Sequence, residues 1–174
     1  FKNNHFDFII TNPPFGSSIK ENEKHYLKSF ELGNKKPDWL DYKNTKTVTR
    51  NNQSTEVLFI EQCYNFLTEG GYLAVVLPDG VLTNSSLQYV RDEIEDWYRI
   101  VAVNSMPQTA FSATGAGVKS SVLFVKKHTE EHTAKLQALK VKIQNELKTK
   151  FKYLETIEKW NTEKAKIIKD LVGF

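Results

Sequence analysis

The sequence predicts an α/β fold in which helices and strands alternate around a mostly parallel sheet. Short apolar runs alternate with amphipathic segments from residue 6 to residue 127, which is the pattern of a doubly wound sheet. Only about a dozen residues without helical periodicity separate the last two predicted strands, too few for a crossover helix. We therefore expect the final strand to pair antiparallel with its neighbour, inserted into an otherwise parallel sheet.

The first predicted strand, Phe6–Thr11, is a short run of aromatic and β-branched residues typical of a buried strand in a parallel sheet. The tetrapeptide Asn12-Pro13-Pro14-Phe15 follows it directly. Neither proline can donate to a sheet ladder, and each favours extended geometry in the residue before it, so we expect a stiff loop. Ligands of open α/β sheets bind where strands end in this way. The alternative is a turn that merely terminates the strand.

The segment 17–54 is polar, with eight Lys or Arg residues and five Asp or Glu residues. Apart from a short helix near 24–32, it shows no sustained periodicity. Two interpretations stay open: a mobile basic segment that closes over DNA, or a solvated insertion. Trp39 and Tyr42 suit the first interpretation, because exposed aromatic side chains among cations are typical of nucleic-acid contacts.

The remaining elements follow from periodicity and from turn residues. Ser54 or Thr55 is a plausible helix cap, and Gly70-Gly71 is expected to end that helix. Pro78-Asp79-Gly80 predicts a tight turn after a strand. The predicted order is a helix at 55–68, a strand at 72–77, a helix at 84–97, a strand at 99–105, a loop at 108–117 and a strand at 118–126.

The region 128–174 is expected to form a second, helical part after the 1–127 domain. Apolar residues recur there at intervals of three or four, without glycine or proline until Gly173. We expect one long amphipathic helix, or two helices broken near 160–162. Its apolar stripe needs a partner, which is either the sheet itself or a coiled coil with another subunit or a second copy.

Composition limits the classes of function. A chain of 174 residues with 24 Lys or Arg and 21 Asp or Glu carries a formal charge of +3, which is compatible with nucleic-acid binding. One cysteine, Cys63, and four scattered histidines predict neither a disulfide nor a metal site. The absence of a signal sequence and of a long apolar segment predicts a cytoplasmic protein without membrane spans. Because the chain starts at Phe1 and its only methionine is Met106, we expect a piece of a longer protein.

The tetrapeptide resembles the catalytic motif of amino-group methyltransferases that use S-adenosylmethionine. An exocyclic amine on an aromatic base is a weak nucleophile because its lone pair is delocalised into the ring. The resemblance implies that the Asn12 side-chain oxygen and the Pro13 carbonyl accept the two amine hydrogens, which favours a pyramidal nitrogen in the transition state. It also implies that Pro14 stiffens the loop and that Phe15 stacks on a flipped base, with Asn12 and Phe15 next to the methyl donor.

Three further stretches resemble modification subunits of type I restriction systems: 70–82, 111–124 and 55–59. Together with the tetrapeptide they cover about residues 6–127 in the family's order. The implied function is a DNA adenine-N6 methyltransferase without a metal or a covalent intermediate, whose partners are DNA and a specificity subunit, or a second copy through the C-terminal helices. The implied substrate-binding residues are Asp79, Phe111, Gly115, Gly117 and Lys119. Asp79 as a turn residue and the glycines as flexible hairpin residues are the alternatives.

The chain departs from the family in one respect. The resembled enzymes build most of their methyl-donor pocket on strands that precede the catalytic one, so we expect this chain alone to bind S-adenosylmethionine weakly or not at all and to methylate no DNA. Two other functions stay open. One is methylation of RNA bases or glutamine side chains, against which the 111–124 stretch argues. The other is a non-catalytic assembly or DNA-binding module.

Overall fold

The computed structural model describes residues 2–20, 23–40, 46–111 and 117–172. By their internal contacts the residues form two compact units, Phe1–Thr133 and Ala134–Phe174. We call them the sheet unit and the helical unit, and each is described by itself.

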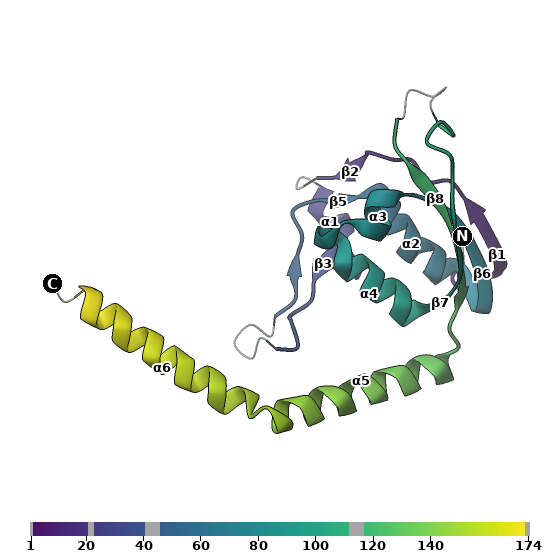
Figure 1. Cartoon of the computed structure of the whole chain (residues 1–174). Helices are drawn as coiled ribbons and strands as arrows, with labels where there is room; N and C mark the ends of the chain where they lie inside the picture. The colour runs from purple at the N-terminus through teal and green to yellow at the C-terminus, as the bar shows by residue number, and fades with distance from the viewer. Residues whose placement is uncertain (1, 21–22, 41–45, 112–116, 173–174) are drawn as a thin grey trace. The chain divides into compact units, whose positions relative to one another are not determined.

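The sheet unit is built on a four-stranded sheet with the order β1-β6-β8-β7 (Figure 1). Its strands are β1 (Phe6–Thr11), β6 (Leu67–Pro78), β7 (Tyr98–Ser105) and β8 (Ser120–Lys127). β1 runs parallel to β6, whereas β8 runs antiparallel to both β6 and β7. The expected mixed α/β sheet with an inserted antiparallel last strand is confirmed. The carboxyl ends of β1, β6 and β7 therefore lie at the same end of the sheet as the start of β8.

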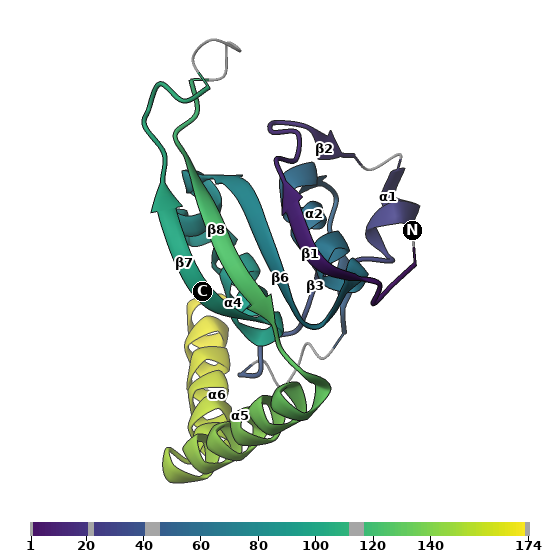
Figure 2. The same ribbon diagram turned by 90° about the vertical axis from the view of Figure 1, so that its right-hand side faces the viewer.

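The helices between the strands cover one face of this sheet (Figure 2). They are α2 (Thr55–Phe66), α3 (Asp79–Thr83), the 3-10 helix η2 (Ser85–Leu87) and α4 (Gln88–Trp97). The crossovers from β1 to β6 and from β6 to β7 advance across the sheet in the same direction, and right-handed crossovers in one direction place their helices on one face. Residues of α2, α4 and the strands form the core there, including Val57, Ile60, Leu73, Val75, Leu77, Val90, Leu123 and Val125.

The other face of the sheet is apolar and exposed in the described part of the sheet unit. Phe8 and Ile10 of β1 are 68% and 82% exposed, and Phe8 stacks on Tyr72 at 5.3 Å between ring centroids. The expectation that β1 is a buried strand is therefore wrong. β1 is an edge strand that pairs only with β6 among the described strands, and its outer-face residues are covered by no helix of the sheet unit.

The boundary between α2 and β6 also differs from the expectation. The helix ends at Phe66, and Leu67 is already extended and fully buried opposite Phe6. Gly70, with φ of +72°, and Gly71 lie inside the strand, beside an irregularity in the β1–β6 register. A Cβ atom at Gly71 would lie 3.1 Å from the Asp7 carbonyl oxygen, so the glycines permit this close approach of two strands. They do not end the helix.

Smaller differences occur at the other predicted elements. The turn predicted at 78–80 is the first turn of the short helix α3. The helix predicted at 84–97 is divided into η2 and α4, with the Asn84 side chain accepting a hydrogen bond from the Ser86 backbone N–H. β7 and β8 lie within two residues of their predicted bounds.

The described parts of the segment 17–54 pack against the core of the sheet unit. It contains β2 (Ser18–Ile19), α1 (Lys24–Leu27), β3 (Asn34–Lys35), β4 (Val48–Thr49) and β5 (Gln53–Ser54). β2 pairs with β5 and β3 pairs with β4, both antiparallel. Leu27 and Leu32 are buried in the hydrophobic core, so the described parts of the segment pack on the sheet unit and are more ordered than the sequence predicted.

The C-terminal helices are α5 (Glu130–Lys150) and α6 (Tyr153–Val172). The break lies at Phe151 and Lys152, where Lys152 has a φ of +46°, and not at the predicted 160–162. Asn161 continues α6 because a single asparagine in an otherwise favourable sequence costs little helix stability. Within the described residues, no helix has both the length and the apolar character required to cross a membrane.

Candidate active site

The tetrapeptide leaves the carboxyl end of β1 at the edge of the sheet. Thr11, the last residue of the strand, pairs with Val75 of β6, and the chain then turns away through the two prolines. Asn12 and Pro14 are exposed, Pro13 is buried and Phe15 is half-buried. The arrangement buries most of Pro13, while Asn12 remains open to solvent.

A clamp from α2 fixes the far end of the tetrapeptide. The Thr55 hydroxyl lies 3.1 Å from the Pro14 carbonyl oxygen and 3.3 Å from the Ser17 carbonyl oxygen, and the Thr55 backbone N–H donates to the latter at 3.0 Å. Gly16 has a φ of +76°, a conformation that glycine adopts without strain. The sequence predicted Ser54 or Thr55 as a helix cap. The structure places Ser54 at the cap position without a side-chain capping hydrogen bond, and Thr55 holds the loop that follows Phe15.

Phe111 lies against Phe15. The two ring centroids are 6.0 Å apart and the ring planes are inclined at 87°, the edge-to-face geometry favoured by aromatic pairs. Phe111 is half-buried, as is Phe15. The structure thus brings together two of the residues that the sequence predicted to form the walls of a base pocket. Each ring keeps exposed surface that a planar ligand can contact.

Asp79 and Lys119 lie at the base of the β7–β8 hairpin that carries Phe111. The Asp79 carboxylate accepts a hydrogen bond from the Ser121 hydroxyl at 2.7 Å, and its backbone N–H donates to the Lys119 carbonyl oxygen at 2.9 Å. The Lys119 ammonium donates to the Ser105 hydroxyl at 2.5 Å and to the Met106 carbonyl oxygen. Both side chains therefore tie the ends of β6, β7 and β8 together, and their polar atoms contact protein groups.

The two hairpin glycines predicted to bind substrate are Gly115 and Gly117. Gly117 is exposed, and a Cβ atom built at this position would meet nothing within 4 Å, so no neighbouring protein atom requires a glycine there. Gly115 lies outside the described residues, as does the rest of 112–116.

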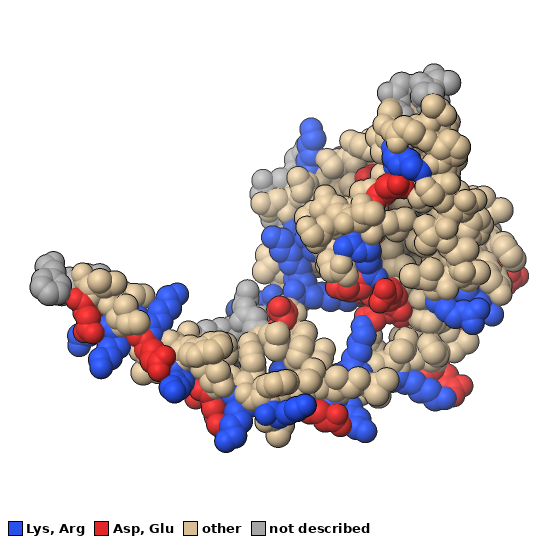
Figure 3. Space-filling view, in the orientation of Figure 1, with Lys and Arg blue, Asp and Glu red and all other residues tan. Residues whose placement is uncertain are grey.

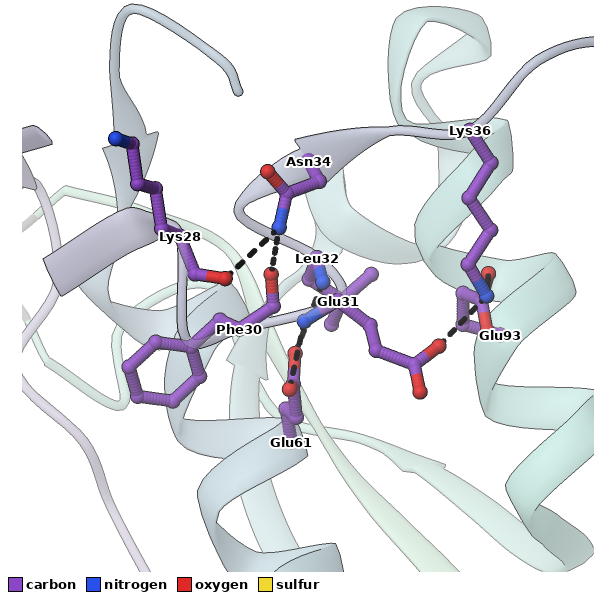
Figure 4. A network of polar contacts seen from close by, with 8 residues as sticks. All are labelled: Lys28, Phe30, Glu31, Leu32, Asn34, Lys36, Glu61 and Glu93. Atoms are coloured by element: carbon purple, nitrogen blue, oxygen red, sulfur yellow. Dashed lines mark hydrogen bonds and ion pairs between the residues drawn. The ribbon is translucent and has the colours of Figure 1, made fainter. Parts of the chain in front are cut away.

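A polar network holds the 17–54 segment to α2 and α4 (Figure 4). The Glu61 carboxylate accepts hydrogen bonds from the backbone N–H groups of Glu31 and Leu32 at 2.8 and 2.9 Å. Burial raises the pKa of Glu61 and outweighs the lowering effect of these two hydrogen bonds, with a smaller contribution from the repulsion by Glu31 and Glu93. Lys36 bridges Glu31 and Glu93 at 2.7 and 2.6 Å.

A second group of contacts completes this anchor. The Gln53 side-chain amide donates to the Leu32 carbonyl oxygen at 2.6 Å and to the Tyr89 hydroxyl at 2.8 Å. The Arg50 guanidinium lies 3.7 Å from the centre of the Tyr89 ring. Tyr89 belongs to α4, and so does Glu93, which contacts Lys36. The end of the segment and Lys36 are therefore held by the same helix.

The tetrapeptide and the hairpin bring polar and aromatic groups together at one end of the sheet. An exposed amide, a backbone fixed by two prolines and an aromatic pair meet at the carboxyl edge of the sheet. A hollow of about 370 Å³ on the open sheet face is lined by apolar side chains, among them Phe8, Tyr72 and Phe124, and suits packing of apolar groups better than a charged nucleoside. Within the described residues, no group of three or more His, Cys, Asp or Glu side chains is placed to hold a metal ion.

Comparisons with known proteins agree with this architecture. Among solved structures, the chain is similar to a class I S-adenosylmethionine-dependent methyltransferase from Listeria monocytogenes, with 22% identity over 73% of this chain and 33% of that chain and a TM-score of 0.54. It is similar to a modification subunit of a type I restriction enzyme from Vibrio vulnificus, with 22% identity over 71% and 23% of the two chains and a TM-score of 0.51.

The M protein of the type I restriction enzyme EcoKI is also similar, with 26% identity over 74% of this chain and 22% of that chain and a TM-score of 0.50. This chain thus spans 22–33% of the length of these proteins, and no curated protein matches it. The sequence profile described as N-6 DNA Methylase matches residues 1–170, nearly the whole chain. The family expected from the tetrapeptide and the hairpin is confirmed: the chain belongs to the N-6 DNA methylase family.

Proposed function

We propose that this chain carries the catalytic loop of an S-adenosylmethionine-dependent DNA adenine-N6 methyltransferase of a restriction-modification system. The observation that carries the proposal is the exposed Asn12 amide at the carboxyl end of β1, beside the Phe15–Phe111 ring pair. Family membership supports the reaction class, and the described geometry supports the assignment of roles to individual residues.

Asn12 and Pro13 orient the target amine. The Asn12 side-chain oxygen and the Pro13 carbonyl oxygen accept the two amine hydrogens of the adenine. These bonds strengthen as the nitrogen becomes pyramidal and its lone pair turns out of the ring plane, so they stabilise the transition state more than the ground state. S-adenosylmethionine, when bound, would supply an electrophilic methyl group, and Asn12 and Phe15 would be residues of this chain that contact it. The methylated nitrogen is acidic and loses its proton afterwards without a dedicated base.

Phe15 and Phe111 hold the base outside the duplex. A paired adenine cannot reach a loop at a sheet edge, so the base is flipped, and unstacking it costs a few kcal/mol. Stacking on Phe15 offsets part of this cost, and Phe111 braces the ring of Phe15 from the side. Asp79 and Lys119 act indirectly, because their bonds fix the hairpin that positions Phe111.

The rest of the enzyme lies outside these residues. The chain spans 22–33% of the similar structures, and by family resemblance the remaining wall of the methyl-donor pocket comes from other strands. The apolar residues of α6, of which Leu154, Trp160 and Leu171 are 51%, 60% and 71% exposed, form the contact with a specificity subunit.

Replacement of Asn12 in the complete protein tests the proposal. We expect Asn12→Ala to abolish formation of N6-methyladenine in duplex DNA, measured by mass spectrometry, while DNA binding is retained. Asn3→Ala is the matched control, because Asn3 is an exposed asparagine just before the opposite end of the same strand. Unchanged methylation in Asn12→Ala contradicts the proposal and favours an assembly role. Methyl incorporation into RNA or glutamine instead of DNA contradicts the substrate assignment.

A further inference from the structure

We propose that the described part of the segment 17–54, with Lys20, Lys28, Lys35 and Lys46, is a binding surface for the phosphate backbone of DNA next to the target base. The inference rests on the proposed methyltransferase function and assigns a role to a segment that the tetrapeptide and hairpin do not explain. Four features carry it: the distribution of charge, the lack of ion-pair partners for the exposed lysines, the rigid attachment of the segment, and its connection to the catalytic loop.

The positive charge of the chain is concentrated in this segment. It has eight Lys or Arg residues against five Asp or Glu, an excess of three. The whole chain has 24 against 21, the same excess, so the other residues together are neutral. A surface that contains all of the net positive charge is the part of the chain that attracts a polyanion most strongly.

Four exposed lysines of the segment have no ion-pair partner among the described residues: Lys20, Lys28, Lys35 and Lys46. Basic side chains gather on the side of the sheet unit that carries α1 and β3, at the left in Figure 3. The Tyr26 ring, 55% exposed and 3.9 Å from the His25 ring, lies in the same stretch as these cations. Cations mixed with an exposed aromatic ring are typical of nucleic-acid surfaces.

Three carboxylates near these lysines, those of Glu31, Glu61 and Glu93, contact other groups. Glu31 and Glu93 both contact Lys36, which leaves Lys36 bound to the body of the unit. Glu61 accepts two backbone N–H groups and is buried. These acids therefore anchor the segment without neutralising Lys20, Lys28, Lys35 or Lys46.

The anchor makes the surface rigid where it is described. Leu27 and Leu32 are buried in the core, and Gln53 holds the Leu32 carbonyl oxygen at 2.6 Å. A preformed surface loses little conformational entropy when a ligand binds, which favours binding at modest charge. One interpretation of the sequence was a mobile segment that closes over DNA. The described residues can contact DNA without such a closing motion.

Both ends of the segment meet the catalytic loop. Ser18 and Ile19 pair with Ser54 and Gln53, and the Thr55 hydroxyl reaches the Pro14 carbonyl oxygen at 3.1 Å. The lysines therefore start three residues after Ser17, whose carbonyl oxygen the clamp holds, and five residues after Phe15. Phosphates flanking a flipped nucleotide pass this position, and contacts with them hold the duplex in register while carrying no sequence information.

Charge reversal in the complete protein tests the inference. Binding of a duplex that contains the target site is measured between 50 and 300 mM salt for the triple variant Lys20→Glu, Lys28→Glu, Lys35→Glu. Each lost phosphate contact makes the slope of log K against log salt shallower by about 1, so three lost contacts lower affinity by roughly a hundredfold or more near 100 mM salt. The control is Lys2→Glu with Arg99→Glu. It reverses exposed charges near the starts of β1 and β7, whereas the catalytic loop follows the end of β1.

The outcomes separate this inference from the proposed function. A shallower salt slope in the triple variant but not in the control supports the phosphate surface, provided that both variants melt at the wild-type temperature. An unchanged slope overturns it, even when the wild-type protein methylates adenine. Loss of binding to an RNA duplex or to a protein partner with unchanged DNA binding also overturns it. If the wild-type protein methylates no DNA but the triple variant has a shallower salt slope, the proposed function is wrong and the phosphate-binding surface is still supported.

Discussion

The rings of Phe111 and Phe15 pack edge to face, with their centroids 6.0 Å apart and their planes inclined at 87°. The two residues lie near opposite ends of the sheet unit's sequence. The contact depends on the order β1-β6-β8-β7, which places the start of β8 and the end of β1 at one edge of the sheet. A loop anchored by prolines and a hairpin anchored by Asp79 and Lys119 thus converge on the same ring pair.

We predict that the two rings act together on an extruded base. Phe15→Ala removes the stacking surface and weakens binding of DNA with an extruded target base by about 1–3 kcal/mol. Phe111→Ala weakens it by about 1 kcal/mol, because it removes only the edge-to-face support. The readout in the complete protein is the fluorescence of 2-aminopurine at the target position. The double variant should lose less than the sum of the single variants, since both act on one ring.

A matched control for the ring pair is Phe151→Ala, which removes a phenylalanine that is 64% exposed in the helical unit. It should leave the fluorescence signal unchanged. Additive losses in the double variant would show that Phe111 contacts the DNA independently of Phe15. A Phe111→Ala variant with wild-type fluorescence would remove Phe111 from the proposed pocket.

Thr55 is predicted to position the catalytic loop. Thr55→Val retains the shape of the side chain but loses the hydroxyl that reaches the Pro14 and Ser17 carbonyl oxygens, a bond worth about 1 kcal/mol. We expect kcat of the complete enzyme to fall about three- to tenfold with little change in KM. Thr55→Ser should restore kcat, because serine keeps the hydroxyl. A loss of stability with unchanged kcat would limit Thr55 to a structural role.

The pH dependence of stability tests the anchor at Glu61. Burial raises the pKa of Glu61 above its ordinary value of 4.5, so the folded state holds a proton that the unfolded chain releases. The stability from this group is present in full below pH 4.5 and is lost as the pH rises through the raised pKa. Glu61→Gln removes this titration and one of the two acceptor oxygens, and should destabilise by about 1 kcal/mol.

The destabilisation by Glu61→Gln should therefore be largest at low pH and should shrink as the pH rises. Chemical denaturation at several pH values from 4 to 7 measures the free energy of unfolding of the wild type and the variant. Glu69→Gln is the matched control, because Glu69 is an exposed glutamate outside the anchor. A difference for Glu61→Gln that grows with pH would contradict the direction of the pKa shift.

The sequence predicted the strand Phe6–Thr11 with its correct bounds, because an apolar run followed by two prolines leaves little choice. It did not predict that Phe8 and Ile10 are exposed, since a short apolar run does not reveal how many faces of a strand are covered. The position of Gly70 inside β6 was also missed. Glycine favours a helix end and a strand irregularity equally, and only the partner strand decides between them.

Within the candidate site, the sequence placed the tetrapeptide and Phe111 in one family pattern, and the structure adds their contact. The sequence did not predict the clamp by Thr55 or the anchor by Glu61. They depend on two-residue strands and on backbone N–H groups far away in the chain, which leave no periodic signal. The same applies to the break at Lys152, where a residue that is not glycine adopts a positive φ.

We predict that the 174-residue chain alone binds S-adenosylmethionine weakly or not at all. Among the described strands β1 pairs only with β6. Under the proposed function, Asn12 and Phe15 supply one side of the cofactor site and strands outside these residues supply the other side. A ligand held on one side keeps most of its surface in water and gains too little contact to offset its loss of translational freedom. Isothermal titration of the chain should give no measurable heat at concentrations where the complete protein binds. The complete protein is the positive control, and micromolar binding by the chain alone would show that these residues suffice for the cofactor site.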